Sequence, residues 1–477
     1  MKDDICIWPH VLPFPIKAKK RKMILAILES RVGVSILTHI KINARTFQHD
    51  LIDRLHYSNK SVIKYLKLMV ETHVLEHGME RIEEKGKATW MKWYYPTDLG
   101  RWVILFLIPP EEIQTELAKQ TIDELFRLYS SSVVEVCEKY SFTIDSFQQV
   151  FDEQYMKATI TDARKTQSKV VVYGSAALDI YGKLERLPSI DETVYVEETG
   201  RYAGGMGANV SVALARLKIP VAFVGKIGAD FVGRILLENL VKNSINVSNV
   251  TIAANRSLRT LILQDAKGGR WLLALGSPEH ALSITSPSEI DWNLIDQSQI
   301  VYVGEVFTEI ASTIASYAKN KEKMVIYRPG APYLRLGLDK LQDTLKHVNI
   351  FILNSIGWKG LQESSKKPLK TPKDLLMYGP KVVILTKGEE GCVVYTEEDS
   401  YVMLVSANLR AKFKIVDQTG AGDSFSAGLI RGLLAEWELK KAVSFGQVAA
   451  CITCSRIGAS PAFPILSEVE SAALENS

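Results

Sequence analysis

The strongest signal in the chain is the segment Asp417-Gln418-Thr419-Gly420-Ala421-Gly422-Asp423-Ser424-Phe425-Ser426-Ala427-Gly428, which leads into an apolar helical run. Glycines where a helix begins let backbone N–H groups converge on an anion, and the helix dipole strengthens the attraction. An aspartate there can accept the proton of a hydroxyl group within hydrogen-bond reach. The segment therefore predicts a phosphate site with a carboxylate beside it. The structural alternative is a glycine-rich helix start that an aspartate caps.

A second glycine-rich segment, Gly204-Gly205-Met206-Gly207-Ala208-Asn209, also precedes an apolar helical run. It does not match the dinucleotide pattern GxGxxG, because the third glycine and a clear acidic partner for a ribose are missing. The chain also lacks the phosphate-loop pattern GxxxxGK. A bound nucleotide would therefore be held in another way.

Together the two segments resemble the signatures of the ribokinase-like sugar kinases, also called the PfkB family. The resemblance covers residues 169–477 and implies ATP as the phosphate donor and Mg²⁺ as the metal ion. It also implies that a hydroxyl group of a sugar or nucleoside is the acceptor. By this resemblance Asp423 is the catalytic base, and the amides of Gly420, Ala421 and Gly422 form the anion hole.

The resemblance also implies roles for residues outside the C-terminal motif. Gly204 and Gly205 would join a lid to the core, next to the acceptor, and Asn209 and Asp179 would bind its hydroxyl groups. For Asp179 the alternative is an aspartate that caps a turn at the end of a strand. Two further loops resemble the nucleotide side of the family. The expected ATP-binding residues are Asn354, Thr386, Lys387, Gly388, Gly391 and Gly458.

Residues 169–477 alternate short apolar segments with helical ones, which is typical of a doubly wound α/β sheet with helices on both faces. The stretches 193–202 and 259–274 alternate polar and apolar residues, and they fit a small β lid better than the core sheet. A lid would exclude water during phosphoryl transfer. Buried parallel strands are predicted at 170–173, 221–224, 300–303, 324–327, 350–353 and 382–386.

Residues 1–108 show a different pattern, in which short helices precede a hairpin rich in Trp and Tyr. This order resembles the winged helix-turn-helix domains of prokaryotic transcription regulators, an α+β fold. The predicted order is a helix that includes Met23–Leu28, a helix at 46–55, a helix from Lys60 that Ser58 or Asn59 caps, hairpin strands at 80–84 and 89–95, and a helix that Thr97 or Asp98 caps.

The basic charge of the chain is concentrated near its N-terminus. Residues 1–110 carry eighteen basic and eleven acidic side chains, whereas the rest of the chain is slightly acidic. A helix with Lys60, Lys64 and Lys67 on its outer face fits a major groove, and a wing with Lys85 and Lys87 would contact phosphate. Double-stranded DNA is therefore an expected partner. The alternative is a small helical domain that binds a protein or packs on the kinase.

Residues 109–168 read as a helical linker without a catalytic motif. Such a segment can pair two chains, and a palindromic operator would need that pairing. A homodimer is therefore expected, although a rigid spacer explains the same pattern.

The composition predicts a cytoplasmic protein. The chain contains no run of eighteen or more uncharged apolar residues, the length that a membrane span needs. The early segment 7–16 is too short and too rich in proline for a span or a signal peptide. The five cysteines form neither a disulfide framework nor a zinc site, because the one CxxC pair lacks further ligands nearby.

The chain departs from the family pattern at two positions that concern the chemistry. Where the family carries Asn-x-x-Glu, this chain has Asn354-Ser355-Ile356-Gly357, so the ligands of the metal stay unknown. Where many relatives have an aspartate before a proline, this chain has Arg328, which can pair with a phosphate or a carboxylate. These departures leave open an alternative function, a transcription regulator whose kinase-like domain only senses a sugar or nucleotide.

Overall fold

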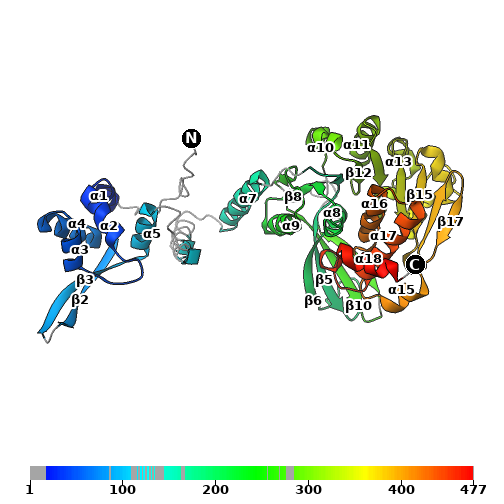
Figure 1. The fold of residues 1–477 in the computed structure, drawn as a ribbon. Helices are drawn as coiled ribbons and strands as arrows, with labels where there is room; N and C mark the ends of the chain where they lie inside the picture. Colours follow the sequence, from blue (N-terminus) through cyan, green and yellow to red (C-terminus); the bar gives the residue numbers. More distant parts are fainter. Residues whose placement is uncertain are drawn as a thin grey trace. The chain divides into compact units, whose positions relative to one another are not determined.

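The computed structural model describes residues 18–84, 87–108, 144–162 and 167–475, except 255, 268 and 276–283, together with short helical pieces between 115 and 134. The chain divides into two compact units, Met1–Ile144 and Asp145–Ser477 (Figure 1). Lys85 and about half of the linker predicted at 109–168 lie outside the described residues.

The second unit is built on a sheet with the strand order β17-β16-β15-β14-β13-β12-β4-β7. The six predicted strands are present and parallel, and β16 and β17 extend the sheet in the antiparallel sense. Parallel strands that are covered on both faces are apolar throughout, which is why they could be recognised. The strands are β4 (Val170–Tyr173), β7 (Val221–Val224), β12 (Ile300–Val303), β13 (Met324–Tyr327), β14 (Ile350–Asn354), β15 (Val382–Thr386), β16 (Cys392–Thr396) and β17 (Ser400–Met403).

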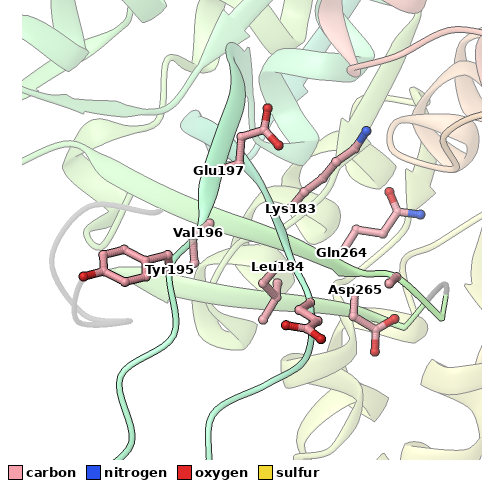
Figure 2. A pocket seen from close by; sticks show the side chains of 9 residues that line it. Lys183, Leu184, Tyr195, Val196, Glu197, Gln264 and Asp265 are labelled. Carbon is pink, nitrogen blue, oxygen red and sulfur yellow. The ribbon is translucent and has the colours of Figure 1, made fainter.

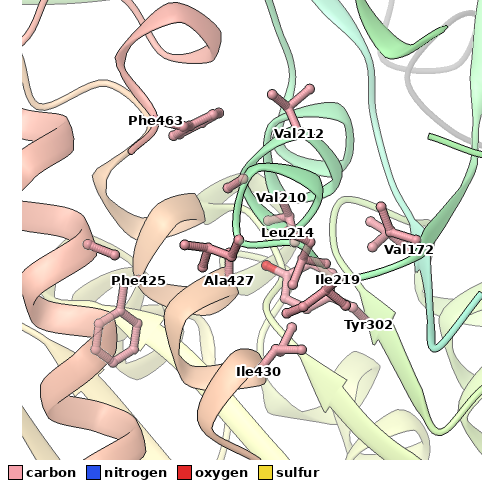
Figure 3. Packing of buried hydrophobic residues seen from close by; sticks show 14 of the residues in the cluster. Val172, Val210, Val212, Leu214, Ile219, Tyr302, Phe425, Ala427, Ile430 and Phe463 are labelled. Atoms are coloured by element: carbon pink, nitrogen blue, oxygen red, sulfur yellow. The ribbon is translucent and has the colours of Figure 1, made fainter. Parts of the chain in front are cut away.

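Helices cover both faces of this sheet, and each face has its own apolar core. On one face, buried residues of α8 and α16 gather over the sheet, among them Val210, Leu214, Ala427 and Ile430 (Figure 3). That layer contains α8 (Met206–Arg216), α9 (Phe231–Lys242), α16 (Ala421–Leu434), α17 (Leu439–Cys454) and α18 (Leu466–Leu474). The other layer contains α10 (Trp292–Gln297), α11 (Thr308–Asn320), α12 (Ala331–Leu334), α13 (Leu338–Leu345) and α14 (Ser355–Ser364).

A separate four-stranded sheet forms the predicted lid, with the order β11-β10-β5-β6. Its strands are β5 (Ala177–Leu184), β6 (Glu197–Gly204), β10 (Leu258–Asp265) and β11 (Arg270–Leu275). Strand β5 was not predicted as part of the lid, although it pairs with both β6 and β10. A two-stranded pair of β8 (Lys226–Gly228) and β9 (Thr251–Ala253) lies between these elements in the chain.

The last part of the predicted linker belongs to the second unit. Helix α7 (Ile144–Asp162) places Met156, which is fully buried, in the same apolar core as α8 and α16. Asp152 is 2% exposed and forms an ion pair with Arg234 of α9 at 3.0 Å. Helix α7 therefore packs on the kinase-like core as an integral element.

The first unit contains helices around a three-stranded sheet with the order β1-β3-β2. Ser58 caps α4, and Thr97 caps α5, as the sequence predicts. Helix α2, capped by Ser30, was not predicted, and the hairpin strands are longer than expected. The elements are α1 (Ala18–Leu28), α2 (Arg31–His39), β1 (Thr46–Phe47), α3 (Gln48–Arg54), α4 (Asn59–Glu71), β2 (Leu75–Glu84), β3 (Lys87–Pro96) and α5 (Asp98–Leu107).

Helix α4 buries one face and exposes the other. Val62, Leu66 and Met69 are buried in the apolar core of the first unit, whereas Lys60, Lys64 and Lys67 are exposed. The outward position that the sequence predicts for these three lysines is therefore observed.

Among the described residues, no helix is both long and apolar enough to cross a bilayer.

Candidate active site

The carboxyl ends of β4 and β12 lie where the strand order changes direction, because β7 and β12 flank β4 on opposite sides. In open α/β sheets, ligands bind at such a point. Ser175, just after β4, donates a hydrogen bond to the carboxylate of Glu305, just after β12. Gly174 and Gly207 approach so closely that a Cβ on Gly207 would lie 2.7 Å from the Cα of Gly174. Two glycines thus bring the start of α8 onto the end of β4.

The N-terminus of α16 is directed by one glycine. Gly420 is the N-cap and has a φ of 80°, in the left-handed region that residues with a side chain rarely adopt. The first turn contains Ala421 and Gly422, and Asp423 follows them with 7% of its surface exposed. The first turn of α16 therefore lies in the interior of the unit and carries the acidic side chain of Asp423.

Both carboxylate oxygens of Asp423 have partners from other elements. Asn209 of α8 donates to Oδ2 from Nδ2 at 2.9 Å, and Arg328, directly after β13, contacts Oδ1 from Nη1 at 2.6 Å. Burial raises the pKa of Asp423, whereas the charge of Arg328 and the two hydrogen bonds act in the opposite direction. The Oδ1 atom of Asn209 is itself buried and has no hydrogen-bond partner among the described residues.

Asp179 lies inside lid strand β5 and is 6% exposed. Burial raises its pKa to about 7, and the nearby carboxylates of Asp423 and Glu305 act in the same direction. A Cβ on Gly204 would lie 2.1 Å from Oδ2 of Asp179, so the carboxylate fills the space that this glycine leaves open. Gly205 follows with a φ of 89° and begins α8. The lid and α8 therefore meet beside Asp179.

Asp417 ties the loop before α16 to the lid and to the C-terminal turn. It accepts hydrogen bonds from the hydroxyl of Tyr181 at 3.0 Å, from the amide of Gly458 at 3.0 Å, and from the amide and hydroxyl of Thr419. Burial opposes ionisation, but these hydrogen bonds hold the pKa of Asp417 below its usual range. Arg270 of the lid also donates to the hydroxyl of Thr419 at 2.6 Å.

Five of the six residues predicted for ATP lie at the same edge of the sheet, where β14 and β15 end, whereas Gly458 follows α17 and donates to Asp417. Asn354 and Thr386 are direct neighbours in the register of these two strands. The loop from Lys387 to Gly391 contains glycines at positive φ, 59° at Gly388 and 101° at Gly391. A Cβ on Gly391 would meet the carbonyl oxygen of Met403 at 2.1 Å, so this position requires glycine.

A protein-held metal ion finds little support in these residues. The described part of the chain holds no group of three or more His, Cys, Asp or Glu side chains with metal-binding geometry. Asn354 uses its side chain to cap α14 by accepting from the amide of Gly357 at 2.7 Å. Mg²⁺ commonly keeps several waters and binds substrate phosphates with one or two carboxylates. The residues present fit a magnesium ion that arrives with a nucleotide better than a resident one.

Comparison with known proteins assigns this unit to a family. A family model described as pfkB family carbohydrate kinase matches residues 167–466. The chain belongs to the pfkB family of carbohydrate kinases. A ribokinase of Lactococcus lactis subsp. lactis is 29% identical to this kinase over 308 residues, which are 64% of this chain and 96% of the relative.

Solved structures share the fold of this pfkB kinase. Ribokinase of Arabidopsis thaliana, solved with ribose and ATP, has a TM-score of 0.55 at 23% identity and covers 64% of this chain and 99% of its own. The nucleoside kinase of Methanocaldococcus jannaschii has a TM-score of 0.56 at 22% identity, with 66% and 99% covered. The ribokinase-like α/β fold of the second unit, predicted from its two glycine-rich segments, is thereby confirmed.

The sequence assigns no role in the site to two residues, Glu305 and Arg328, that lie beside Asp179 and Asp423. Glu305 directly follows Gly304 at the end of β12, and burial raises its pKa. An acidic residue directly after a buried strand, where the strand order changes direction, is the sequence feature that could have indicated a role for Glu305. Arg328 was recognised as a departure from the family pattern, but nothing in the sequence shows that it contacts Asp423, 95 residues away.

The lid of the kinase carries a separate hollow of about 680 Å³, formed along β5, β6 and β10 (Figure 2). Its lining residues are Lys183, Leu184, Glu185, Tyr195, Val196, Glu197, Gln264, Asp265 and Ala266. None of the residues placed around Asp423 is among them. The hollow is therefore distinct from the candidate active site.

Proposed function

We propose that this pfkB kinase transfers the γ-phosphoryl group of ATP to a hydroxyl group of a sugar or nucleoside, with Asp423 as the general base. The observation that carries the proposal is a buried carboxylate in the first turn of a 14-residue helix, at the point of the sheet where ligands bind. Amides at a helix N-terminus stabilise phosphate charge, and the neighbouring carboxylate can take the proton of the incoming alcohol.

The acceptor side combines polar groups that suit hydroxyl groups. Asn209 has a buried carbonyl oxygen that finds no partner within the described part of the chain, and an acceptor hydroxyl would satisfy it. Asp179 lies next to Gly204 and Gly205 and would accept from a second hydroxyl when it is ionised. Glu305 is close enough to affect the ionisation of Asp179 and belongs to the same side. These groups support a neutral, hydroxyl-rich acceptor.

On the donor side we assign the phosphates to the amides of Gly420, Ala421 and Gly422. We assign the rest of ATP to Asn354, Thr386, Lys387, Gly388, Gly391 and Gly458, which follow neighbouring strands or lie on loops tied to α16. Mg²⁺ bound to the nucleotide would neutralise part of the phosphate charge. The chain's own residues hold the helix start in place through Asp417 and keep water away from Asp423 by burial.

The direct test is acceptor-dependent release of ADP. Purified full-length protein is incubated with ATP, magnesium and a panel of sugars and nucleosides, and ADP is measured with and without each acceptor. The proposal predicts that at least one acceptor raises ADP release above the background of ATP alone. ATP binding without any acceptor-dependent ADP would contradict catalysis.

One observation favours a second candidate, a regulator whose kinase-like unit only senses a ligand. Both oxygens of Asp423 are engaged, and Gly357 stands where a metal-binding glutamate is expected. A sensor would bind a sugar or nucleotide without turnover, and the ligand would change the affinity of the protein for DNA. Measuring both properties in the same preparation separates the two candidates.

For the first unit we propose a winged helix-turn-helix fold that binds double-stranded DNA. Support comes from the order of its elements and from the exposed Lys60, Lys64 and Lys67 on α4, with Lys87 at the start of the second hairpin strand. We further propose that the protein forms a homodimer, because a symmetric operator needs two copies of the reading helix. We also propose that it acts in the cytoplasm.

A further inference from the structure

Arg328 occupies the space between the proposed base and the proposed phosphate site. Its guanidinium contacts Oδ1 of Asp423 at 2.6 Å. A Cβ on Gly422 would lie only 2.2 Å from Nη2 of the same guanidinium, so Arg328 also lies against the first turn of α16. The side chain is 17% exposed, and it comes from the end of the central strand β13. One cation thus touches both parts of the proposed machinery.

The ion pair weakens Asp423 as a base in this arrangement. Arg328 contacts one carboxylate oxygen and Asn209 donates to the other, so both oxygens already hold one partner. A carboxylate paired with a guanidinium is a weaker base than a free one, although each oxygen keeps a lone pair for another donor. Proton transfer to Asp423 therefore becomes easier when one of the two partners leaves. Arg328 is the better candidate, because an incoming triphosphate offers it a stronger partner.

We propose that Arg328 is a phosphate-contacting residue that moves its hydrogen bonds from Asp423 to the γ-phosphoryl group when ATP binds. This inference rests on the proposed function. Arg328 then stabilises charge on the transferring group, and Asp423, freed from the ion pair, becomes a stronger base for the acceptor hydroxyl. In the transfer step the acceptor oxygen forms a bond to the γ-phosphorus, and the bond from that phosphorus to the bridging oxygen of ADP breaks. The acceptor proton goes to Asp423, and ADP leaves with the electron pair.

Electrostatics favour the γ-phosphoryl group of ATP, rather than an anionic acceptor, as the partner of Arg328. Three carboxylates face the acceptor side, those of Asp179, Glu305 and Asp423, and burial raises the pKa of each. An acidic acceptor would meet this concentration of carboxylates, whereas the helix start beside Gly422 attracts negative charge. Guanidinium groups bind phosphate oxygens in a bidentate manner and stabilise transferring phosphoryl groups in other enzymes. A terminal phosphate therefore fits Arg328 better than an acceptor carboxylate does.

The test compares binding of ADP with binding of a nonhydrolysable ATP analogue, AMP-PNP, by calorimetry with magnesium. Arg328→Gln should weaken AMP-PNP binding at least about tenfold relative to ADP, because only AMP-PNP has the γ-phosphoryl group. It should also lower kcat by about 10²- to 10³-fold with little change in the KM of the acceptor. Arg328→Lys keeps the charge but not the planar fork, and it should restore only part of both effects.

The outcomes separate this inference from the proposed function. An unchanged ratio of AMP-PNP to ADP affinity in both variants would overturn the role of Arg328, even if the protein is a kinase. A rise in acceptor KM without any nucleotide effect would do the same and would indicate an anionic acceptor. A lost γ-phosphate preference with no acceptor phosphorylated would keep the inferred contact and remove the proposed catalysis. If Arg328→Gln does not fold, Arg328→Lys decides by the same ratio.

Discussion

The two units of this protein differ in whether their functional charged side chains are buried or exposed. The kinase unit buries Asp179 and Asp423 beside the partly buried Glu305 and Arg328, whereas the first unit exposes Lys60, Lys64 and Lys67 on α4. Burying an ionised group costs several kcal/mol unless it is well paired, so such a cluster needs a functional explanation. Exposed lysines carry almost no such cost. The group of carboxylates in the kinase unit is therefore the stronger indication of chemistry. Whether the three exposed lysines of α4 bind DNA has to be decided by experiment.

The largest expected effect on stability concerns the border between the units. Met156 of α7 is fully buried in the kinase core, so Met156→Ala should lower the free energy of unfolding of the kinase unit by about 2–5 kcal/mol. Calorimetry should show that only the kinase transition moves. Val150→Ala, at a position on the same helix that is 56% exposed, is the matched control and should change little. A shift of the first unit's transition would contradict this border.

The next effect comes from the buried charge of Asp179. Its pKa is raised from 3.8 to about 7, so the folded state favours the neutral form. Stability that is present below about pH 4 is therefore lost as the pH rises to about 7, by roughly 1.4 kcal/mol for each pH unit. Asp179→Asn stays neutral and should raise the melting temperature at pH 8 but not near pH 4.

The same variant should weaken acceptor binding, because it removes a carboxylate that accepts from hydroxyl groups. Asp339→Asn, at a half-exposed position on α13, is the control for stability and for activity. If Asp179→Asn and Asp339→Asn have the same pH profile of unfolding, the buried-charge account of the acceptor side is wrong.

The smallest expected effect concerns DNA. Each phosphate contact that is lost lowers the dependence of log affinity on log salt by about 0.9. Lys60→Ala with Lys64→Ala should therefore reduce this slope by up to about 1.8, while kinase activity stays unchanged. The control pair is Lys22→Ala with Lys41→Ala, two exposed lysines outside α4. Equal losses for both pairs in a mobility-shift titration would indicate nonspecific attraction without a reading helix.

The core strands could be predicted because each is a short apolar run between polar turns, and the predicted α/β fold is confirmed. Strand β5 was missed as a lid element because it contains Asp179 and Lys183, which interrupt the apolar pattern. Helix α7 was assigned to the linker because its pattern is weak and its partners are distant in sequence. Arg234, for example, lies more than 80 residues from Asp152.

The site shows the same division between local and distant information. The helix start at Gly420 is encoded by neighbouring residues, so its form follows from the sequence. The contacts of Asp423 with Asn209 and Arg328 join residues 214 and 95 positions apart, and only the folded chain brings them together. The proposed roles of these residues remain predictions that kinetics must test.

The most direct test of the account is the rate of phosphoryl transfer in a single turnover. Wild type and Asp423→Asn are mixed with saturating ATP, magnesium and the acceptor that the panel identifies, and the phosphorylated product is followed by rapid quench. The account predicts a rate about 10²- to 10⁴-fold lower in Asp423→Asn. Affinity for AMP-PNP should be no lower than in wild type, because Arg328 no longer has to leave a carboxylate. A rate within tenfold of wild type would contradict the assignment of Asp423 as the base.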